Sequence, residues 1–284
     1  MPKFSIIIPS YNRANILPRA IQSVFDQTVE DWELILVDDG STDLTSDVIV
    51  QYQKKSRFSY IFQENSGVSQ ARNTGAEKAT GDWLIFLDSD DELTKNALRF
   101  FDEQIQKNNS INLFVAGRER KTDKGSETRI PKKGVSSSML AGTFCLSKSI
   151  FQKVGGYDPR FTFGENTELF HRISELKITK EFIPEVSLIY YNTSSGGSKN
   201  SENIIECTSL FLSKHHHSMS NHHRHQYHQI IAVNSLRFHR FELARKHLWK
   251  AYFLKPINLK TLGRLVLSYF PIISKEIYKR QIEV

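Results

Sequence analysis

The chain has 284 residues, of which 39% are hydrophobic and 24% charged, and this composition is typical of a globular protein with a full hydrophobic core. Its two cysteines provide no disulfide framework, which excludes the small disulfide-rich secreted domains and favours a cytoplasmic protein. The sequence contains no run of about 18 apolar residues, which argues against a membrane-spanning helix.

The net charge of +7 is distributed unevenly along the chain. Residues 1–204 carry 25 Lys and Arg against 27 Asp and Glu, whereas residues 205–284 carry 13 against 4 and nine of the ten histidines. We therefore expect two parts, a main domain over 1–204 and a basic extension over 205–284. A basic segment of this kind can meet nucleic acid, anionic lipid or an acidic partner, and its charge alone does not choose among them.

The first hundred residues alternate apolar, strand-like segments with segments of helical periodicity. Strands are expected at residues 4–9, 32–37, 60–62 and 83–87, and helices at residues 15–27, 67–79 and 94–106. The first apolar run is too short for a signal peptide. This alternation predicts an α/β fold with a mainly parallel sheet covered by helices on both faces. Ligands bind at the carboxyl ends of such strands, where polar clusters occur at residues 10–13, 38–43 and 88–92.

The remainder of the chain is less regular. Residues 120–138 are polar and predict a mobile loop, and residues 193–201 form a Gly/Ser-rich hinge. The tail that follows is expected to be helical, with apolar stripes at 241–252 and 259–270. These helices either dock on a membrane surface or a partner, or pack as an antiparallel pair on the main domain. The histidine-rich run at 214–228 favours a solvated, partly helical surface over a metal site, because its spacing defines no ligand set.

Asp88, Asp90 and Asp91 follow directly after an apolar strand, and carboxylates packed this densely repel each other. A hard divalent cation would relieve the repulsion. Alternatively, the cluster caps the next helix or lies in solvent. No G-x-G-x-x-G or G-x-x-x-x-G-K-[ST] loop is present, which disfavours NAD enzymes and P-loop NTPases. A nucleotide diphosphate held by metal and side chains fits better.

Four motifs, SIIIPSYNR, LILVDDGSTD, ENSGVSQARNTG and WLIFLDSDD, resemble in order and spacing the family 2 inverting glycosyltransferases, which have the GT-A fold. The resemblance covers about residues 3–195 and implies a Rossmann-like mixed sheet flanked by helices. It implies a donor side formed by Pro9, Tyr11, Asp39, Arg72 and Asp88, with Mn²⁺ or Mg²⁺ bound by Asp88 and Asp90.

The same resemblance implies a reaction and its partners. A hexosyl or N-acetylhexosaminyl group would pass from a nucleotide-diphosphate sugar, commonly UDP-linked, to an acceptor hydroxyl in glycan or polysaccharide biosynthesis. The acceptor would be a glycan or a lipid-linked molecule, and no nucleic-acid partner is expected. The location would be cytoplasmic, with peripheral contact to the inner face of the membrane if the basic helices dock there.

The general base departs from the family pattern. The family usually carries Glu-Asp at the start of the helix after the acceptor loop, and the Asp acts as base. Here Glu165 is followed by Asn166, whose amide cannot accept a proton at neutral pH. Either Glu165, or Glu168 one turn along the helix, replaces the base, or the protein is a catalytically silent module that binds nucleotide-sugars. We expect an active enzyme with Glu165 as base.

A nucleotidyltransferase is the other alternative among enzymes, because it also places a nucleotide and a metal at strand ends. It would normally carry a glycine-rich, arginine-containing loop after the first strand. The segment PSYNRAN has no such loop.

Overall fold

The computed structural model describes residues 2–122, 125–133, 139–191 and 201–278. The chain forms two compact units: unit 1 comprises Met1–Arg160 and Glu165–Ser194, and unit 2 comprises Phe161–Gly164 and Ser195–Val284. The boundary expected between residues 204 and 205 falls inside helix α7 (Ser201–His215). Residues 193–200 of the expected hinge lie outside the described residues.

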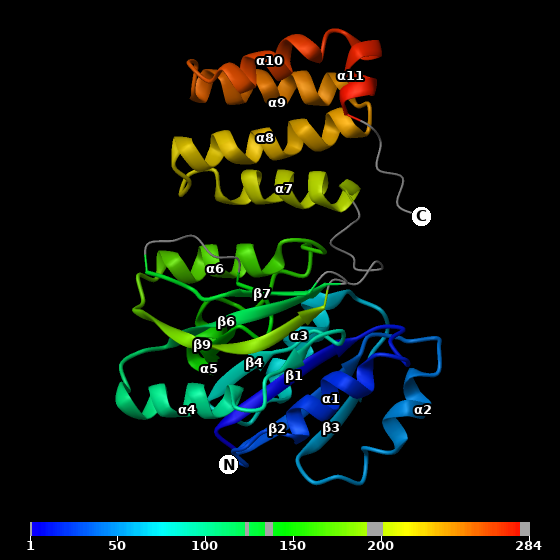
Figure 1. The fold of residues 1–284 in the computed structure, drawn as a ribbon, viewed down its shortest axis with the longest axis vertical. Helices are drawn as coiled ribbons and strands as arrows, with labels where there is room; N and C mark the ends of the chain where they lie inside the picture. The colour runs from blue at the N-terminus through cyan, green and yellow to red at the C-terminus, as the bar shows by residue number, and fades with distance from the viewer. Residues whose placement is uncertain (1, 123–124, 134–138, 192–200, 279–284) are drawn as a thin grey trace. The chain divides into compact units, whose positions relative to one another are not determined.

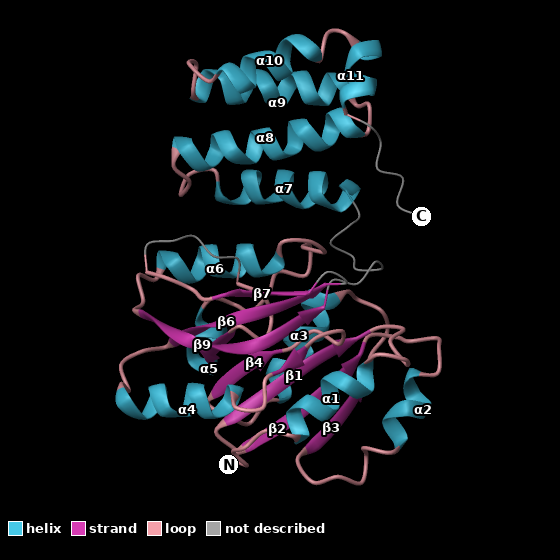
Figure 2. Cartoon of the chain, viewed as in Figure 1, coloured by secondary structure: helices cyan, strands magenta, loops and turns pink. Residues whose placement is uncertain are grey.

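Unit 1 is built on a mixed sheet with helices on both faces (Figure 1, Figure 2). Its strand order is β3-β2-β1-β4-β8-β6-β9-β5, and β7 pairs with β6. The strands are β1 (Phe4–Ser10), β2 (Trp32–Asp38), β3 (Phe58–Phe62), β4 (Trp83–Phe86), β5 (Glu92–Leu93), β6 (Leu113–Thr122), β7 (Gly125–Arg129), β8 (Phe144–Ser147) and β9 (Lys180–Tyr191). Strands β1 to β4 are parallel, and β8 runs antiparallel to both of its neighbours. The predicted α/β fold with a mixed sheet is confirmed.

The central strand β1 is apolar throughout because both faces of the sheet are covered. Ile6 and Ile8 pack with α1 (Leu17–Phe25), α2 (Thr45–Val50) and α4 (Ala97–Lys107). Ile7 packs on the opposite face, where the helices are α3 (Val68–Lys78), α5 (Lys148–Lys153) and α6 (Glu165–Glu175). All three isoleucines are 0% exposed, and burying each contributes about 1.5–3 kcal/mol.

A glycine in α3 allows this helix to lie close to the sheet. A Cβ at Gly75 would lie 2.5 Å from Cγ2 of Ile7, well inside van der Waals contact. Any larger residue would push the helix away from β1. The close approach matters because Arg72, one turn earlier on the same helix, is thereby held near the carboxyl ends of the strands.

The prediction of a mobile loop over residues 120–138 is wrong for its first half. Strand β6 continues to Thr122, and β7 pairs with it antiparallel, with Arg118 opposite Arg129. Every residue of β7 is exposed. The hairpin therefore has no buried face, and its sequence lacks the alternation of apolar and polar residues from which a strand is predicted. Residues 123–124 and 134–138 lie outside the described part.

Unit 2 is helical, as predicted for the tail (Figure 1). Its helices are α7, α8 (Asn221–Arg237), α9 (Phe241–Leu254), α10 (Leu259–Leu267) and α11 (Pro271–Ile277). The buried side chains that α8, α9 and α10 share are Ala232, Leu236, Ala244, Leu248 and Leu265. Within the described residues, none of the helices combines the length and the apolar character needed to span a bilayer.

The histidine-rich run is not simply a solvated surface. Helix α8 starts inside the run, where the Ser220 hydroxyl accepts a hydrogen bond from the amide N–H of His223. His215 and His225 are buried, and Nδ1 of His225 lies 2.9 Å from the carbonyl oxygen of Ala251. The sequence alone could not separate these two from their exposed neighbours, because burial depends on contacts between side chains, such as that of His225 with α9.

Candidate active site

The polar clusters that follow β1, β2 and β4 lie at one edge of the sheet. The amide N–H of Asp39 donates to the carbonyl of Ser10 at 2.8 Å, and that of Leu87 donates to the carbonyl of Ile7 at 2.9 Å. Because all three strands are parallel, their carboxyl ends bring Asp39 and Asp88 to the two sides of the end of β1.

Asp39 is buried and held by three donors. Its Oδ1 accepts from the Gln63 side chain at 2.6 Å and from the Ser66 amide at 2.9 Å, and its Oδ2 accepts from the Gly67 amide at 2.8 Å. A carboxylate offers about four acceptor positions, and the donors found within the described residues occupy three of them. The donors lie on the segment between β3 and α3, and two of them are backbone groups that any residue could supply. We call these three donors the clamp on Asp39, and the sequence alone did not reveal it.

The loops after β1 and β2 are tied together beside Asp39. The amide oxygen of Asn12, whose φ is 52°, accepts from the backbone N–H of Thr42 at 2.8 Å. Gly40 has a φ of 80°, and a Cβ there would lie 2.8 Å from a backbone nitrogen of the segment before α3. The ring of Tyr11 is 46% exposed, while Pro9 is buried in β1. Only Tyr11 of this pair presents a ring to solvent.

The three aspartates after β4 have different surroundings. The side chain of Asp88 is 37% exposed, whereas Asp91 is 1% exposed and accepts from the amide N–H of Tyr191 at 3.0 Å. Burial and then the neighbouring charge of Asp88 raise the pKa of Asp91 to about 9. The backbone carbonyl of Asp90 accepts from the guanidinium of Arg19 at 2.6 Å. Asp91 thus faces the protein, and Arg19 fixes the backbone between it and Asp88.

Arg72 joins two carboxylates that are far apart in the sequence. One terminal nitrogen donates to Oδ1 of Asp88 at 2.6 Å, and the other donates to Oε1 of Glu165 at 2.8 Å. The guanidinium is 2% exposed and lies 5.2 Å from the ring centre of Tyr157. Burial opposes its charge, but the two carboxylates outweigh burial and raise the pKa of Arg72. The resemblance placed Arg72 on the donor side, and the geometry favours a role in ordering the two carboxylates.

Asn166 supports Glu165 at the start of α6. Its amide oxygen accepts from the hydroxyl of Tyr157 at 2.8 Å, and its amide nitrogen lies 3.3 Å from Oε1 of Glu165. Burial raises the pKa of Tyr157, so the phenol stays protonated and donates. A carboxylate at position 166 could not donate to Glu165. The amide therefore holds the glutamate that the sequence suggests as base.

Glu168 is engaged elsewhere. Its side chain is 1% exposed, and both of its oxygens accept from Arg172, at distances of 2.6 to 3.0 Å. Arg172 also donates to the carbonyl of Val154. A bidentate, buried carboxylate of this kind stabilises the packing of α6 against α5 rather than meeting a substrate.

The arrangement brings together most of the residues that the sequence suggested. Asp88 and Glu165 share one guanidinium, Asp39 lies across the end of β1, and Glu168 is set apart by its own arginine. Chemically, the site offers oxygen ligands for a hard cation and a partly buried carboxylate that can accept a proton. The supporting residues that sequence reasoning missed are Arg19, Gln63, Tyr157 and Tyr191.

Comparisons with known proteins identify the family of the chain. The sequence profile described as Glycosyl transferase family 2 matches residues 5–164. A putative teichuronic acid biosynthesis glycosyltransferase of Bacillus subtilis is 44% identical over 99 residues, 34% of this chain and 39% of that protein. A GalNAc(5)-diNAcBac-PP-undecaprenol beta-1,3-glucosyltransferase of Campylobacter jejuni is 41% identical over 101 residues, 34% of this chain and 33% of that protein. The matches thus span less than two-fifths of these curated relatives.

The fold is shared with solved structures over almost the whole chain. The crystal structure of S. aureus TarS 1-349 in complex with UDP covers 99% of this chain, and this chain covers 90% of it, with a TM-score of 0.66 and 16% identity. The corresponding complex with UDP-GlcNAc has a TM-score of 0.64 and 18% identity, over 94% of this chain and 79% of the other. At this identity the likeness establishes the GT-A fold.

Proposed function

The chain belongs to the family 2 glycosyltransferases, and from this premise we propose that it transfers a sugar from a nucleotide-diphosphate sugar to an acceptor hydroxyl with inversion. One observation carries the proposal, which is the bridge from Asp88 through Arg72 to Glu165. It joins the acidic end of β4, where the donor diphosphate would lie, to the carboxylate that would serve as base. Donor binding and proton acceptance therefore belong to one site.

The nucleotide would be recognised at the ends of β1 and β2. The remaining acceptor position of Asp39 suits a base N–H or a ribose hydroxyl, and the exposed ring of Tyr11 can stack on a planar base. Pro9 would line the same wall from within β1. The two TarS structures are complexes with UDP and with UDP-GlcNAc, and we propose a UDP-linked hexosyl or N-acetylhexosaminyl donor for this chain.

The acidic cluster fits a divalent cation. Asp88 and Asp90 are both at least partly exposed, whereas the third carboxylate, Asp91, is turned towards the backbone of β9. Two carboxylates, with substrate phosphates completing the shell, suit Mg²⁺ or Mn²⁺. Asp88 and Asp90 would hold the ion, which when bound supplies Lewis-acid stabilisation of the departing diphosphate.

Glu165 is proposed as the general base. Its side chain is 15% exposed, and it is held by Arg72 and Asn166, so it presents its remaining oxygen in a fixed direction. It would accept the proton of the acceptor hydroxyl as that oxygen attacks the anomeric carbon from the side opposite the leaving group. Attack in one step inverts the anomeric centre. Glu168 is not favoured for this role, because Arg172 neutralises it in a buried position.

The experiment is a screen of UDP-linked sugars for release of UDP, with Mn²⁺ or Mg²⁺ and with excess EDTA. Metal-dependent release from at least one donor is expected, since water can replace the missing acceptor. Binding of UDP without release from any donor, also in the presence of cell-derived glycan and lipid-linked acceptors, would instead support the catalytically silent module.

We also propose that the helical unit contacts the membrane, which suits a lipid-linked acceptor such as the PP-undecaprenol molecule in the name of the Campylobacter relative. Helices α9 and α11 and the turn between α9 and α10 carry exposed apolar side chains, among them Phe253, Ile272 and Ile257 at 73%, 84% and 92%. Residues 205–284 carry 13 Lys and Arg against 4 Asp and Glu, which favours anionic lipid.

Flotation with anionic liposomes tests this contact. The wild type should float with the liposomes, whereas the double variant Ile257→Gln/Ile272→Gln should stay in the soluble fraction. The matched control Leu44→Gln, exposed in unit 1, should float like the wild type, and equal flotation of all three would remove the idea.

A further inference from the structure

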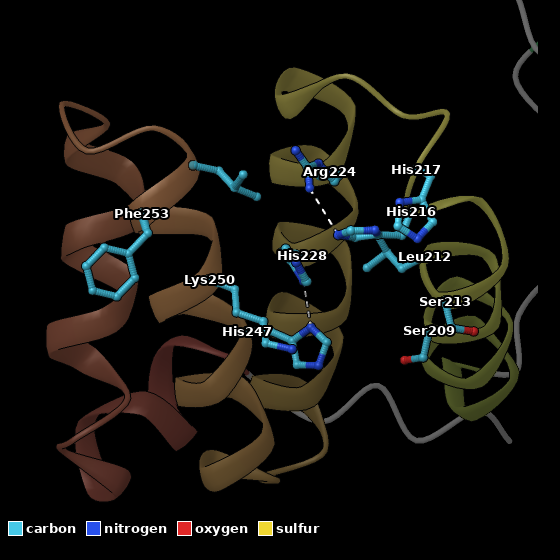
Figure 3. A pocket seen from close by; sticks show the side chains of 11 residues that line it. Ser209, Leu212, Ser213, His216, His217, Arg224, His228, His247, Lys250 and Phe253 are labelled. Atoms are coloured by element: carbon cyan, nitrogen blue, oxygen red, sulfur yellow. Dashed lines mark hydrogen bonds between the residues drawn. The ribbon is translucent and has the colours of Figure 1, made fainter.

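Unit 2 contains a pocket of about 640 Å³ between α7, α8 and α9 (Figure 3). Two permanent cations, Arg224 and Lys250, and four histidines line it together with two serines and three apolar side chains. None of its described lining residues is acidic. Phe253 and Leu212 provide apolar wall on opposite helices. The pocket therefore combines positive charge with an apolar surface.

The positive charge in this pocket lacks a counter-charge. Arg224 donates to the side chain of Asn221 and lies 3.1 Å from Nε2 of His216, both of which are neutral or basic partners. Its Nε is buried and has no hydrogen-bond partner in the described part of the chain. Within that same part, no carboxylate pairs with Arg224 or Lys250. A guanidinium with unused donors and no carboxylate can bind an anion.

His228 and His247 lie on the same two helices as Arg224 and Lys250, α8 and α9. Nδ1 of His228 lies 3.0 Å from Nδ1 of His247, so one ring donates and the other accepts (Figure 3). Burial first, and then His247 and Lys250, lower the pKa of His228 to about 4. Burial and then Lys250 lower the pKa of His247 to about 4 as well. Both rings are therefore neutral near pH 7 and supply N–H and N: groups rather than further charge.

We propose that this pocket binds a phosphate ester, with the phosphate at Arg224 and Lys250 and the organic part against Leu212 and Phe253. A phosphate group provides several strong acceptor oxygens for the terminal N–H groups of Arg224 and for the ammonium of Lys250. The volume exceeds what inorganic phosphate alone would fill, and the apolar wall suits a carbon-bearing group. The site lies wholly within unit 2 and is independent of the residues of the donor site.

The test uses the full chain labelled with ¹⁵N-histidine, with UDP and Mg²⁺ in excess so that the donor site is occupied. Glycerol 3-phosphate is titrated while the ring nitrogen signals of His228 and His247 are followed. These signals should shift saturably, and inorganic phosphate should shift them more weakly. Glycerol, which lacks the anion, should leave them unchanged. Absence of any shift with millimolar glycerol 3-phosphate would overturn the proposal.

Variants distinguish a built site from general attraction to a basic surface. Arg224→Gln should weaken binding about tenfold or more, as expected for loss of a charge-assisted hydrogen bond. Lys275→Gln, which removes an exposed cation of unit 2 outside the pocket, should bind like the wild type. Equal weakening by both variants would contradict a specific site. If Arg224→Gln does not fold, Lys250→Gln carries the same test.

Two further titrations distinguish a lipid headgroup from a soluble phosphate, and a phosphate site from a metal site. Vesicles of phosphatidylcholine with phosphatidic acid replace glycerol 3-phosphate in one arm. Shifts that depend on Arg224 with the vesicles identify a lipid headgroup, and shifts with the soluble ester alone identify a soluble phosphate. In the other arm Zn²⁺ is added alone. If stoichiometric Zn²⁺ moves the histidine signals and no phosphate compound does, the pocket is a metal site and the proposal is wrong.

Discussion

Replacement of Arg72 by lysine tests whether one guanidinium holds the two halves of the candidate active site together. Lysine keeps the charge, but its ammonium is a compact group that cannot extend two planar donor edges to Asp88 and Glu165 at once. One of the two charge-assisted hydrogen bonds should therefore be lost, and each is worth about 1.5–3 kcal/mol when buried. Because the Asp88 side chain is 37% exposed, solvent screening reduces the free energy of the Arg72–Asp88 hydrogen bond. The net cost should be about 2 kcal/mol of unfolding free energy.

Urea denaturation followed by tryptophan fluorescence measures this cost in unit 1 alone. The chain has three tryptophans, and Trp249 belongs to unit 2. In a Trp249→Phe background, Trp32 and Trp83 report only on the sheet of unit 1. The matched control is Arg160→Lys, which weakens an ion pair with Asp158 in which the arginine is 62% exposed.

The control variant should unfold close to the wild type, because solvent screens an exposed ion pair. If Arg72→Lys lowers the unfolding free energy no more than Arg160→Lys does, the buried bridge does not hold the site, and the argument from it is refuted. A cost well above about 5 kcal/mol would also contradict the estimate, since that exceeds the loss of a complete buried ion pair.

Three further outcomes follow from the same contacts. Asp90→Asn should abolish metal-dependent donor binding, measured by calorimetry with UDP and Mn²⁺, and should leave the circular dichroism spectrum intact; unchanged binding would remove Asp90 from the cation site. Glu168→Gln should lower stability by about 3 kcal/mol, because it leaves the Arg172 charge poorly compensated, and an unaltered urea midpoint would contradict the buried ion pair. The pKa values of His228 and His247 are lowered to about 4, so the unfolded chain binds more protons and unit 2 should lose stability as the pH falls from about 6.5 to 4. After discounting for solvent screening the pair accounts for about 2 kcal/mol, and His228→Gln should flatten this dependence in denaturation curves followed at Trp249.

Much of the donor side could be predicted because its signals are local. Asp39 and Asp88 each follow an apolar strand, and the rule that parallel strands end at one edge of the sheet brings them together. The alternation of strands and helices, and the helical stripes of the tail, follow from periodicity in short windows. Such features need no knowledge of which segments meet in space.

What the sequence could not supply depends on contacts between distant segments. The clamp on Asp39 uses backbone N–H groups of Ser66 and Gly67, which leave no trace in residue identity. Asn166 stood out only as a missing base, and its use as a donor to Glu165 needed the position of Tyr157. The hairpin of β6 and β7 lacked apolar alternation.

The most direct test of the account compares nucleotide binding and turnover in the wild type and in Glu165→Gln. The variant keeps a group that can accept the hydrogen bond from Arg72, but it cannot take a proton from an acceptor. We predict that Glu165→Gln binds UDP with Mn²⁺ as the wild type does, while release of UDP from the active donor in the presence of its acceptor falls by at least about a hundredfold. Turnover at the wild-type rate in Glu165→Gln would contradict the assignment of the base, and with it the claim that the bridge through Arg72 unites donor binding and catalysis.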